Sequence, residues 1–267
     1  MALITRRRAL LTATGGAGLA LAGCNRITQA DRLTQSMSFQ HVLGYAQAWT
    51  LHTQRLILSG QQLAPEYSRA DISPRFYANG TTNPDTDDYN RAADERFANW
   101  TFDVTGMVRR PLQLTLAQLQ RLPSRTQITR HDCVEGWSAI GQWTGVQLGL
   151  LLHAAGVLPG ARYVVFSCAD NLDGEPAKGG QQSPGQYYES LGLVDAVHPQ
   201  TIIAYAMNGH PLDVPHGAPL RLRVERQLGY KQAKYLTGAR VTDTLAGISG
   251  GHGGYWEDRG YEWYAGI

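Results

Sequence analysis

The sequence predicts one mixed α+β domain behind a leader segment. Short strands and short helices share the chain after residue 60, and neither an internal repeat nor a second linker divides it. Thirty glycines and twelve prolines indicate many tight turns. Charged residues make up 17% and hydrophobic residues 43%, which is a globular composition and excludes a disordered chain. The formal net charge of +2 gives no electrostatic footprint for nucleic acid.

Residues 1–24 have the pattern of an export signal with a lipobox. The basic start contains Arg6 and Arg7, and the apolar stretch 9–22 is too short to span a bilayer. The paired arginines resemble a twin-arginine signal, and the run Leu-Ala-Gly-Cys, ending at Cys24, resembles a site of lipid attachment. We therefore expect a periplasmic protein, with peripheral membrane attachment if Cys24 is lipidated. The alternative is an ordinary secretory signal in which the arginine pair and the cysteine are incidental.

Residues 25–60 are predicted to contain an amphipathic helix, since apolar residues recur at spacings of three and four between Phe39 and Ile57. Residues 61–267 then form the main domain. Its first part, up to residue 100, carries prolines, Asn79-Gly80 and the acidic stretch 85–88, and it shows no period. This composition predicts a long irregular segment, which is usually functional.

From residue 100 the chain alternates between short elements. Helices are expected over 115–122, with Thr115 as the N-cap, and over 146–155, ending before Gly156. Asn208-Gly209 favours a type I′ turn between extended segments at 201–207 and 210–214. Strands are expected over 102–108, 126–133, 163–168, 220–224 and 235–242. Residues 169–186 are predicted to be a polar surface loop, and 247–267 a Gly- and aromatic-rich tail without a period.

The chemistry centres on the cysteines. Besides Cys24 the chain has Cys133 and Cys168, and two cysteines in an exported protein first suggest a disulfide. Cys133, however, ends a predicted strand and precedes a turn, where its side chain can project into a site. The spacings CxxC, HExxH and HxH do not occur, so a structural zinc site is not indicated. A single soft thiolate suits a metal whose other soft ligands belong to an organic cofactor.

Residues 130–148 resemble the cysteine motif of the sulfite-oxidase-fold molybdopterin oxidoreductases; they read RHDCVEGWSAIGQWTGVQL. Two further blocks agree with that family: residues 216–221 followed by 229–234, as in its pterin-binding region, and, more weakly, residues 76–80. The resemblance covers about residues 74–245. It implies the family's mixed sheets and a molybdenum-molybdopterin cofactor, in which the Cys133 thiolate is the protein's ligand to the metal.

The resemblance also implies the site residues. Cys133 and Glu135 are the expected catalytic residues, the second as a proton donor. The phosphate of the cofactor suits Arg or Lys side chains and backbone N–H groups. The expected cofactor-binding residues are Phe76, Tyr77, Asn79, Asp132, Cys168, His216, Arg221, Lys231, Gln232, Ala233 and Lys234. Structural alternatives remain open: a solvated face for the basic residues, a turn cap for His216, core packing for Tyr77 and an inert thiol for Cys168.

Two departures bear on the substrate. Ala78 stands where sulfite oxidases of the family carry an anion-binding Arg, and only about 25 residues follow Thr242, where they have an Ig-like dimerisation domain. The chain is more similar to the bacterial periplasmic methionine-sulfoxide reductase catalytic subunits, which implies a haem-containing membrane electron-transfer partner. We therefore expect reduction of an S-oxide or N-oxide. The alternatives are a sulfite-type oxidase of the same fold and a non-catalytic exported lipoprotein.

Overall fold

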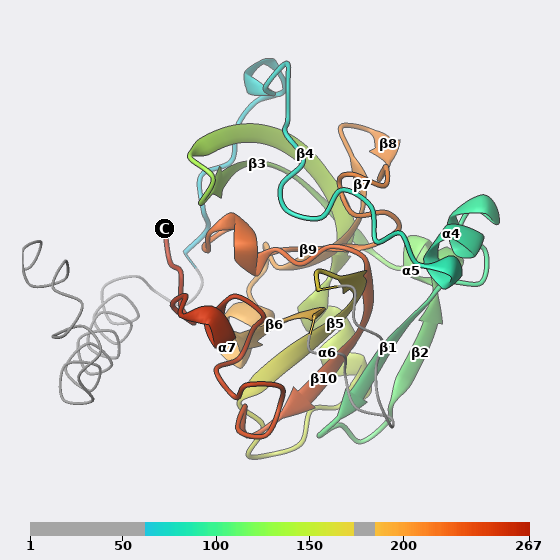
Figure 1. Ribbon diagram of the computed structural model, residues 1–267, viewed down its shortest axis with the longest axis vertical. Coiled ribbons are helices and arrows are strands. Elements are labelled where there is room, and N and C mark those ends of the chain that lie inside the picture. The colour runs from blue at the N-terminus through green and yellow to red at the C-terminus, as the bar shows by residue number, and fades with distance from the viewer. Residues whose placement is uncertain (1–61, 174–184) are drawn as a thin grey trace, which may run out of the picture. The chain divides into compact units, whose positions relative to one another are not determined.

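The computed structural model describes residues 62–173 and 185–267, so the expected export signal and the expected amphipathic helix lie outside the described residues. The described residues contain two sheets (Figure 1). The first has five strands in the order β2 (Leu112–Thr115), β1 (Thr101–Gly106), β10 (Leu236–Thr242), β5 (Tyr163–Asn171) and β6 (Gln186–Gly192). β1 and β10 run parallel, whereas the other neighbours in this sheet are antiparallel.

The second sheet is built on a long hairpin of β3 (Ser124–Cys133) and β4 (Trp137–Gln147), which arches over the first sheet in Figure 1. β4 pairs with β7 (Ile202–Met207), and β7 pairs with both β8 (His210–Pro211) and β9 (Arg221–Arg223). All of these pairs are antiparallel. One mixed sheet, one antiparallel sheet and a few short helices confirm the α+β class.

Local sequence signals explain the helices that were predicted. α5 (Leu116–Arg121) begins after Thr115, whose hydroxyl accepts from the Gln118 N–H, while the Gln118 side chain accepts from the Thr115 N–H in return. α6 (Leu148–Ala155) ends at Gly156, which has φ 71°. The predicted type I′ turn is also present, because Asn208 and Gly209 have φ 50° and 84°.

Several elements differ from the expectation, since β2 and β6 were not predicted either, and two of them show the physical reason. The acidic stretch expected to be irregular contains α4 (Asp87–Asp94), which Thr86 caps by accepting from the Tyr89 N–H. β4 was not predicted, because its glycines weaken the strand pattern. Gly145 is needed there, since a Cβ would lie 2.2 Å from the Ile203 carbonyl oxygen of β7.

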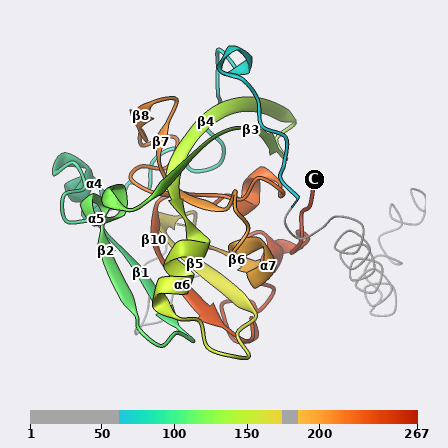
Figure 2. The same ribbon diagram turned by 180° about the vertical axis from the view of Figure 1, so that it is seen from behind.

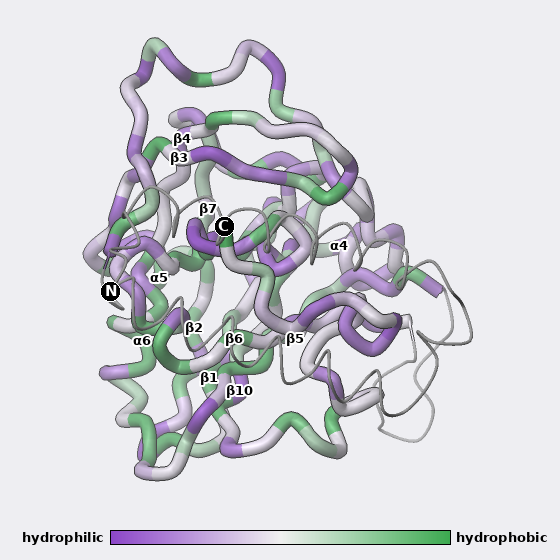
Figure 3. The backbone as a smooth tube through the Cα atoms, turned by 90° about the vertical axis from the view of Figure 1, so that its left-hand side faces the viewer, coloured by the Kyte–Doolittle hydropathy of each residue, from purple (hydrophilic) through white to green (hydrophobic). Residues whose placement is uncertain are grey.

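The main core lies between α6 and the first sheet, on the face turned to the viewer in Figure 2. Leu148, Leu151 and Leu152 of α6 pack there with Val164 and Phe166 of β5, and α6 is mostly green in Figure 3. A smaller core under the second sheet contains Trp143, Ile202 and Met207, among others. Within the described ranges no helix is both long and apolar enough to cross a membrane.

β9 belongs to the second sheet, and the chain that follows it continues into the first sheet. Arg221 and Arg223 are fully buried, so the interpretation of these residues as a solvated face is wrong. The chain continues through a short 3-10 turn, η2 (Gly229–Lys231), into β10. The last residues contain a second such turn, η3 (Glu257–Arg259), and lie along β6, where the Tyr255 N–H donates to the Tyr188 carbonyl over 3.0 Å. α7 (Leu193–Ala196) follows β6 directly.

Candidate functional site

A cavity of about 190 Å³ lies where the β3–β4 turn meets the segment around η2. Cys133 and Glu135 line it from the turn, Asn79 from the segment before α4, and Asp170 from β5. The η2 segment contributes Gly229 and Tyr230, followed by Gln232, Ala233 and Lys234. The cavity therefore gathers six of the expected site residues from three separate parts of the chain.

Cys133 is the last residue of β3, and its position follows from the tight turn after it. The Gly136 N–H donates to the Cys133 carbonyl over 3.1 Å, and Gly136 has φ 90°. The Cys133 side chain faces the cavity while the residue is only 9% exposed. Burial raises the pKa of this thiol above its usual value. The thiol therefore needs a cation beside it to become a thiolate at neutral pH, and a metal ion is such a cation.

Glu135 lies in the same turn, and both of its carboxylate oxygens are held. One accepts from the Gly80 N–H over 3.2 Å, and the other accepts from the Trp137 indole N–H over 3.1 Å. These two bonds fix the carboxylate at the cavity wall, two residues from Cys133. A carboxyl group at this position can hold or release a proton next to the thiol.

Lys234 and Asp170 are the charged groups deeper in the wall. The Lys234 ammonium donates to the carbonyls of Asn79 over 2.7 Å and Pro215 over 3.0 Å, and also to that of Thr81. Burial, together with the nearby Arg221, lowers the pKa of Lys234 to about 7. Burial raises the pKa of Asp170 to about 6, and one of its carboxylate oxygens is buried without a hydrogen-bond partner.

Behind this wall lies a buried basic cluster stacked on Trp143. The guanidinium carbons of Arg221 and Arg223 lie 4.9 and 4.2 Å from the centroid of the Trp143 ring. Arg223 forms a buried pair with Glu225, with bonds of 2.9 and 2.6 Å. Among the described residues, Arg221 donates only to the carbonyls of His216 and Gln232, over 3.0 and 3.4 Å, and its buried Nε has no partner there. Burial, with the charge of Arg223, lowers the pKa of Arg221 to about 9.

Gly217 lies in close contact with the side chains of Lys234 and Arg221. It has φ 105°, and a Cβ there would lie 2.9 Å from the Lys234 side chain and 3.2 Å from that of Arg221. The 216–219 turn can therefore approach the two basic residues only with glycine at this position.

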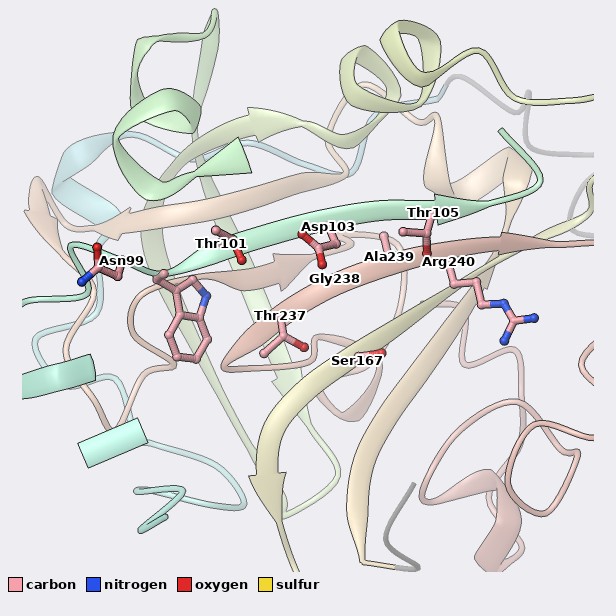
Figure 4. Close-up of a pocket in the computed structure, with 10 residues that line it drawn as sticks. Asn99, Thr101, Asp103, Thr105, Ser167, Thr237, Gly238, Ala239 and Arg240 are labelled. Carbon is pink, nitrogen blue, oxygen red and sulfur yellow. The ribbon is translucent and has the colours of Figure 1, made fainter. Parts of the chain in front are cut away.

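A second hollow, of about 440 Å³, lies on the first sheet (Figure 4). Figure 4 shows short polar side chains along it, among them Thr101, Asp103 and Thr105 of β1 and Ser167 of β5. It contains no cysteine and none of the expected site residues. The smaller cavity at Cys133 is therefore the candidate functional site.

Comparison with known proteins agrees with this choice. Residues 89–247 match the model of the oxidoreductase molybdopterin-binding domain, and this range contains Cys133, Glu135 and Lys234. The chain belongs to this family. It is therefore an enzyme, an oxidoreductase whose cofactor is molybdopterin.

Two relatives match over much of their length. The chain is 35% identical, over 97% of its own length and 87% of the relative's, to a putative protein-methionine-sulfoxide reductase subunit, YedZ1, of Azospira oryzae. It is 32% identical, over 82% and 70%, to the protein-methionine-sulfoxide reductase catalytic subunit MsrP of Xanthomonas campestris. Among solved structures, the sulfane dehydrogenase SoxCD of Paracoccus pantotrophus aligns with a TM-score of 0.46 and 22% identity, over 55% of this chain and 39% of that one.

The residues present fit a molybdopterin-binding oxidoreductase. Cys133 is a free thiol, which is the soft ligand that a molybdenum ion needs from the protein. Asn79 and Gln232 line the cavity and each has a buried side-chain oxygen without a partner, so each can accept from a polar ring system. Arg221, behind them, is a buried guanidinium with no carboxylate paired to it among the described residues, which favours an anion nearby.

Other expected residues lie beside the cavity without lining it. The Phe76 ring packs on four neighbours, at 5.4–5.8 Å from the ring centroids of His131, Trp137, Trp143 and His216. Tyr77 is 45% exposed and packs on Trp137, so the core interpretation of Tyr77 is wrong. Asp132 points away from Cys133 because neighbouring strand residues face opposite sides, and it pairs with Arg130 over 2.9 Å. The Asp213 carboxylate accepts from the His216 backbone N–H over 3.1 Å and also bonds the ring Nδ1, while the His216 Nε2 lies 3.2 Å from the Phe76 carbonyl oxygen.

Three expectations about charge and sulfur need correction. Lys231 does not face the cavity: it is fully buried and pairs with the carboxylates of Glu189 and Glu257, so it is not available to a phosphate. Cys168, expected to bind the cofactor, is a free thiol that lies in the main core and does not line the cavity. The backbone N–H of Gln232 is not free for an anion either, because it donates to the Gly229 carbonyl over 3.0 Å.

Several cavity residues were missed from the sequence. Asp170 was assigned to a surface loop, yet β5 continues through it to Asn171. Tyr187, Trp256 and Tyr261 line the cavity from β6 and from the tail. Two features of the sequence could have pointed to these residues: an aspartate two residues after Cys168, and the cluster of aromatic residues near the end.

Proposed function

We propose that this oxidoreductase reduces neutral S-oxides, with methionine sulfoxide in proteins as the substrate class, and that N-oxides are its secondary substrates. The support from the comparisons is the 35% and 32% identity to two relatives that have that activity in their names, over 97% and 82% of this chain. The observation that carries the proposal comes from the cavity itself: among its described lining residues, Lys234 is the only cationic side chain.

The charge distribution favours a neutral substrate over an oxyanion. Lys234 already donates to three carbonyls, and its pKa of about 7 leaves it only partly charged near neutrality. Two other basic residues close to the site are occupied elsewhere: the Arg75 guanidinium lies 4.3 Å from the Tyr77 ring centroid, and Arg130 pairs with Asp132. An oxyanion would therefore enter without the charge-assisted hydrogen bonds that compensate for its desolvation.

The reaction converts an S-oxide into a thioether and water and consumes two electrons and two protons. When bound, molybdopterin supplies the oxygen-atom and electron chemistry. The chain provides the Cys133 thiol and the polar and aromatic side chains that line the cavity. Glu135 is placed to hold a proton at the carboxylate oxygen that also accepts from Gly80, and to release it toward the oxygen that leaves the substrate.

The test is a direct comparison of sulfoxide reduction and sulfite oxidation on molybdenum-replete protein, with a viologen donor for the reduction. We expect a higher kcat/KM for the sulfoxide. An Ala78→Arg variant serves as the matched control, because it adds the cation that the native position lacks and should improve the use of sulfite. A native enzyme that prefers sulfite to every S-oxide and N-oxide would overturn the proposal in favour of a sulfite-type oxidase.

We further propose that the enzyme is exported to the periplasm by the twin-arginine route and anchored through lipidated Cys24. There it would receive electrons from a haem-containing membrane partner. The support is the pattern of residues 1–24, together with the relatives that are named as subunits. Replacing Arg6 and Arg7 by Lys should retain the precursor in the cytoplasm, and Cys24→Ala should release active protein from the membrane fraction. Normal export of the first variant, or unchanged membrane attachment of the second, would contradict these proposals.

A further inference from the structure

The cavity is lined by two kinds of side chain. Asn79, Gln232 and Lys234 are polar, as a pterin cofactor requires. The aromatic lining consists of Tyr187, Tyr230, Trp256 and Tyr261. Trp256 and Tyr261 come from the tail, which follows the last residue matched by the family model.

The rings of the aromatic lining pack against one another or against a neighbouring aromatic residue. The Trp256 and Tyr261 ring centroids are 5.3 Å apart, and the Tyr230 and Tyr261 centroids are 5.2 Å apart with the rings nearly perpendicular. Tyr255 stacks on Tyr187 at 5.6 Å and also contacts Trp256 at 5.2 Å. The hydroxyl groups of Tyr187 and Tyr230 donate over 2.6 Å to the carbonyls of Tyr230 and Glu262, so the ring faces remain for contact.

The tail is also held firmly against the rest of the domain. Glu257 and Glu189 both pair with the buried Lys231. The tail is therefore bonded directly to η2, whose Gly229 and Tyr230 line the cavity. Arg259 pairs with Asp173 over 2.9 Å, and the Leu228 N–H donates to the Ala265 carbonyl over 2.9 Å. These contacts lie between Trp256 and Tyr261 in the sequence or after them, and they fix where the two rings lie.

We propose that Trp256 and Tyr261 are specificity-determining residues that contact the alkyl or aryl groups of the S-oxide. This inference rests on the proposed function, and it adds which residues of the chain select the substrate. Aromatic faces attract both sulfur and apolar carbon, whereas they offer an oxyanion no hydrogen-bond donor. Tyr261 lines the cavity and is 41% exposed, so it is accessible to an incoming side chain.

The test compares two neutral substrates in the holoenzyme: dimethyl sulfoxide, which is small, and methyl phenyl sulfoxide, which carries an aromatic group. For Trp256→Ala and Tyr261→Ala at equal molybdenum content, we expect kcat/KM for methyl phenyl sulfoxide to fall by about 10-fold or more, mainly through KM, and that for dimethyl sulfoxide to change less than about 3-fold. Trp256→Phe, which keeps an aromatic ring, should retain most of the kcat/KM for methyl phenyl sulfoxide. Trp263→Phe is the matched control, since Trp263 lies in the same tail but bonds Ser190 and does not line the cavity.

Two outcomes would overturn the inference: an equal loss for both substrates, which indicates a structural role, or no loss for either. Failure of the wild-type enzyme to reduce these two sulfoxides and methionine sulfoxide would instead refute the proposed function. In that event calorimetric binding of methyl phenyl sulfide to the holoenzyme, which needs no turnover, decides the inference. Binding about 10-fold weaker in Trp256→Ala supports it, and unchanged binding overturns it.

Discussion

The guanidinium of Arg221 lies 4.9 Å from the ring centroid of Trp143, fully buried and without a carboxylate partner among the described residues. Its neighbour Arg223 lies on the same ring but has Glu225 to balance its charge. A buried, unbalanced cation is costly in an isolated protein. Its presence directly behind the Cys133 cavity is best explained by an anionic group of the cofactor.

Arg221→Met should therefore reduce cofactor occupancy more than it reduces turnover per bound molybdenum. Methionine keeps most of the side-chain volume and its contact with Trp143 but removes the charge. The measurement is molybdenum and phosphate content per protein molecule after purification. Arg130→Met, which removes a half-exposed arginine outside the cavity, is the control and should leave occupancy unchanged. Equal occupancy in the two variants would show that Arg221 is only a packing residue.

Cys133→Ser should keep the fold and the bound pterin but lose activity. The hydroxyl is a harder and weaker ligand than the thiolate, so the metal is held and tuned differently. Activity and pterin content should be measured together with a thermal melt. Cys168→Ala is the matched control, because Cys168 is the other free thiol of the described residues and lies in the core. Wild-type turnover in Cys133→Ser would reject Cys133 as the ligand.

Lys231→Met should lower the free energy of unfolding by about 3–5 kcal/mol, because it leaves the two buried carboxylates of Glu189 and Glu257 without a cation. Burial already raises the pKa of Glu189 well above its usual value, so one carboxylate can take up a proton. Adding Glu257→Gln to Lys231→Met should recover part of the loss. Urea unfolding of both variants measures the effect, and a double variant less stable than Lys231→Met alone would contradict this account.

Local chemistry made part of the fold predictable. The cap at Thr115, the helix end at Gly156 and the turn at Asn208-Gly209 each depend on a few adjacent residues, and all three were confirmed. The helix α4 was missed although its signals were local too: Thr86 and the acidic first turn are typical of a helix start, but Tyr89 is the only residue of α4 that is buried.

The site was less accessible to sequence reasoning, since it depends on distant contacts. Motif resemblance located Cys133, Glu135 and the 229–234 segment, all at the cavity, but no spacing rule distinguishes Lys234 from Lys231. Their difference arises from Glu189 and Glu257, which come from β6 and the tail and together bind Lys231. The aromatic lining likewise depends on the tail packing along β6. The sequence of the tail has no hydrophobic period, so this position could not be predicted.

The last prediction concerns the pH dependence that Asp170 imposes on stability. Burial raises its pKa from 3.8 to about 6, so between these values the folded protein holds a proton that the unfolded chain has released. The stability that this protonated carboxyl provides is fully present below pH 3.8 and is lost as the pH rises through about 6. A shift of about two units corresponds to about 3 kcal/mol.

Asp170→Asn replaces the carboxyl with a neutral group of the same size and should remove this dependence. We expect the stability of the wild type relative to Asp170→Asn to fall by about 2–4 kcal/mol between pH 4 and pH 7, as measured by urea unfolding. The comparison needs the variant because other groups titrate too: burial lowers the pKa of Lys234 to about 7, and this residue adds stability as it loses its proton above that value. Asp88→Asn, whose side chain is 92% exposed, is the control and should give a flat difference. If the stability difference between the wild type and Asp170→Asn also stayed constant with pH, Asp170 would ionise as an ordinary surface carboxylate. The cavity would then carry a full negative charge near Lys234.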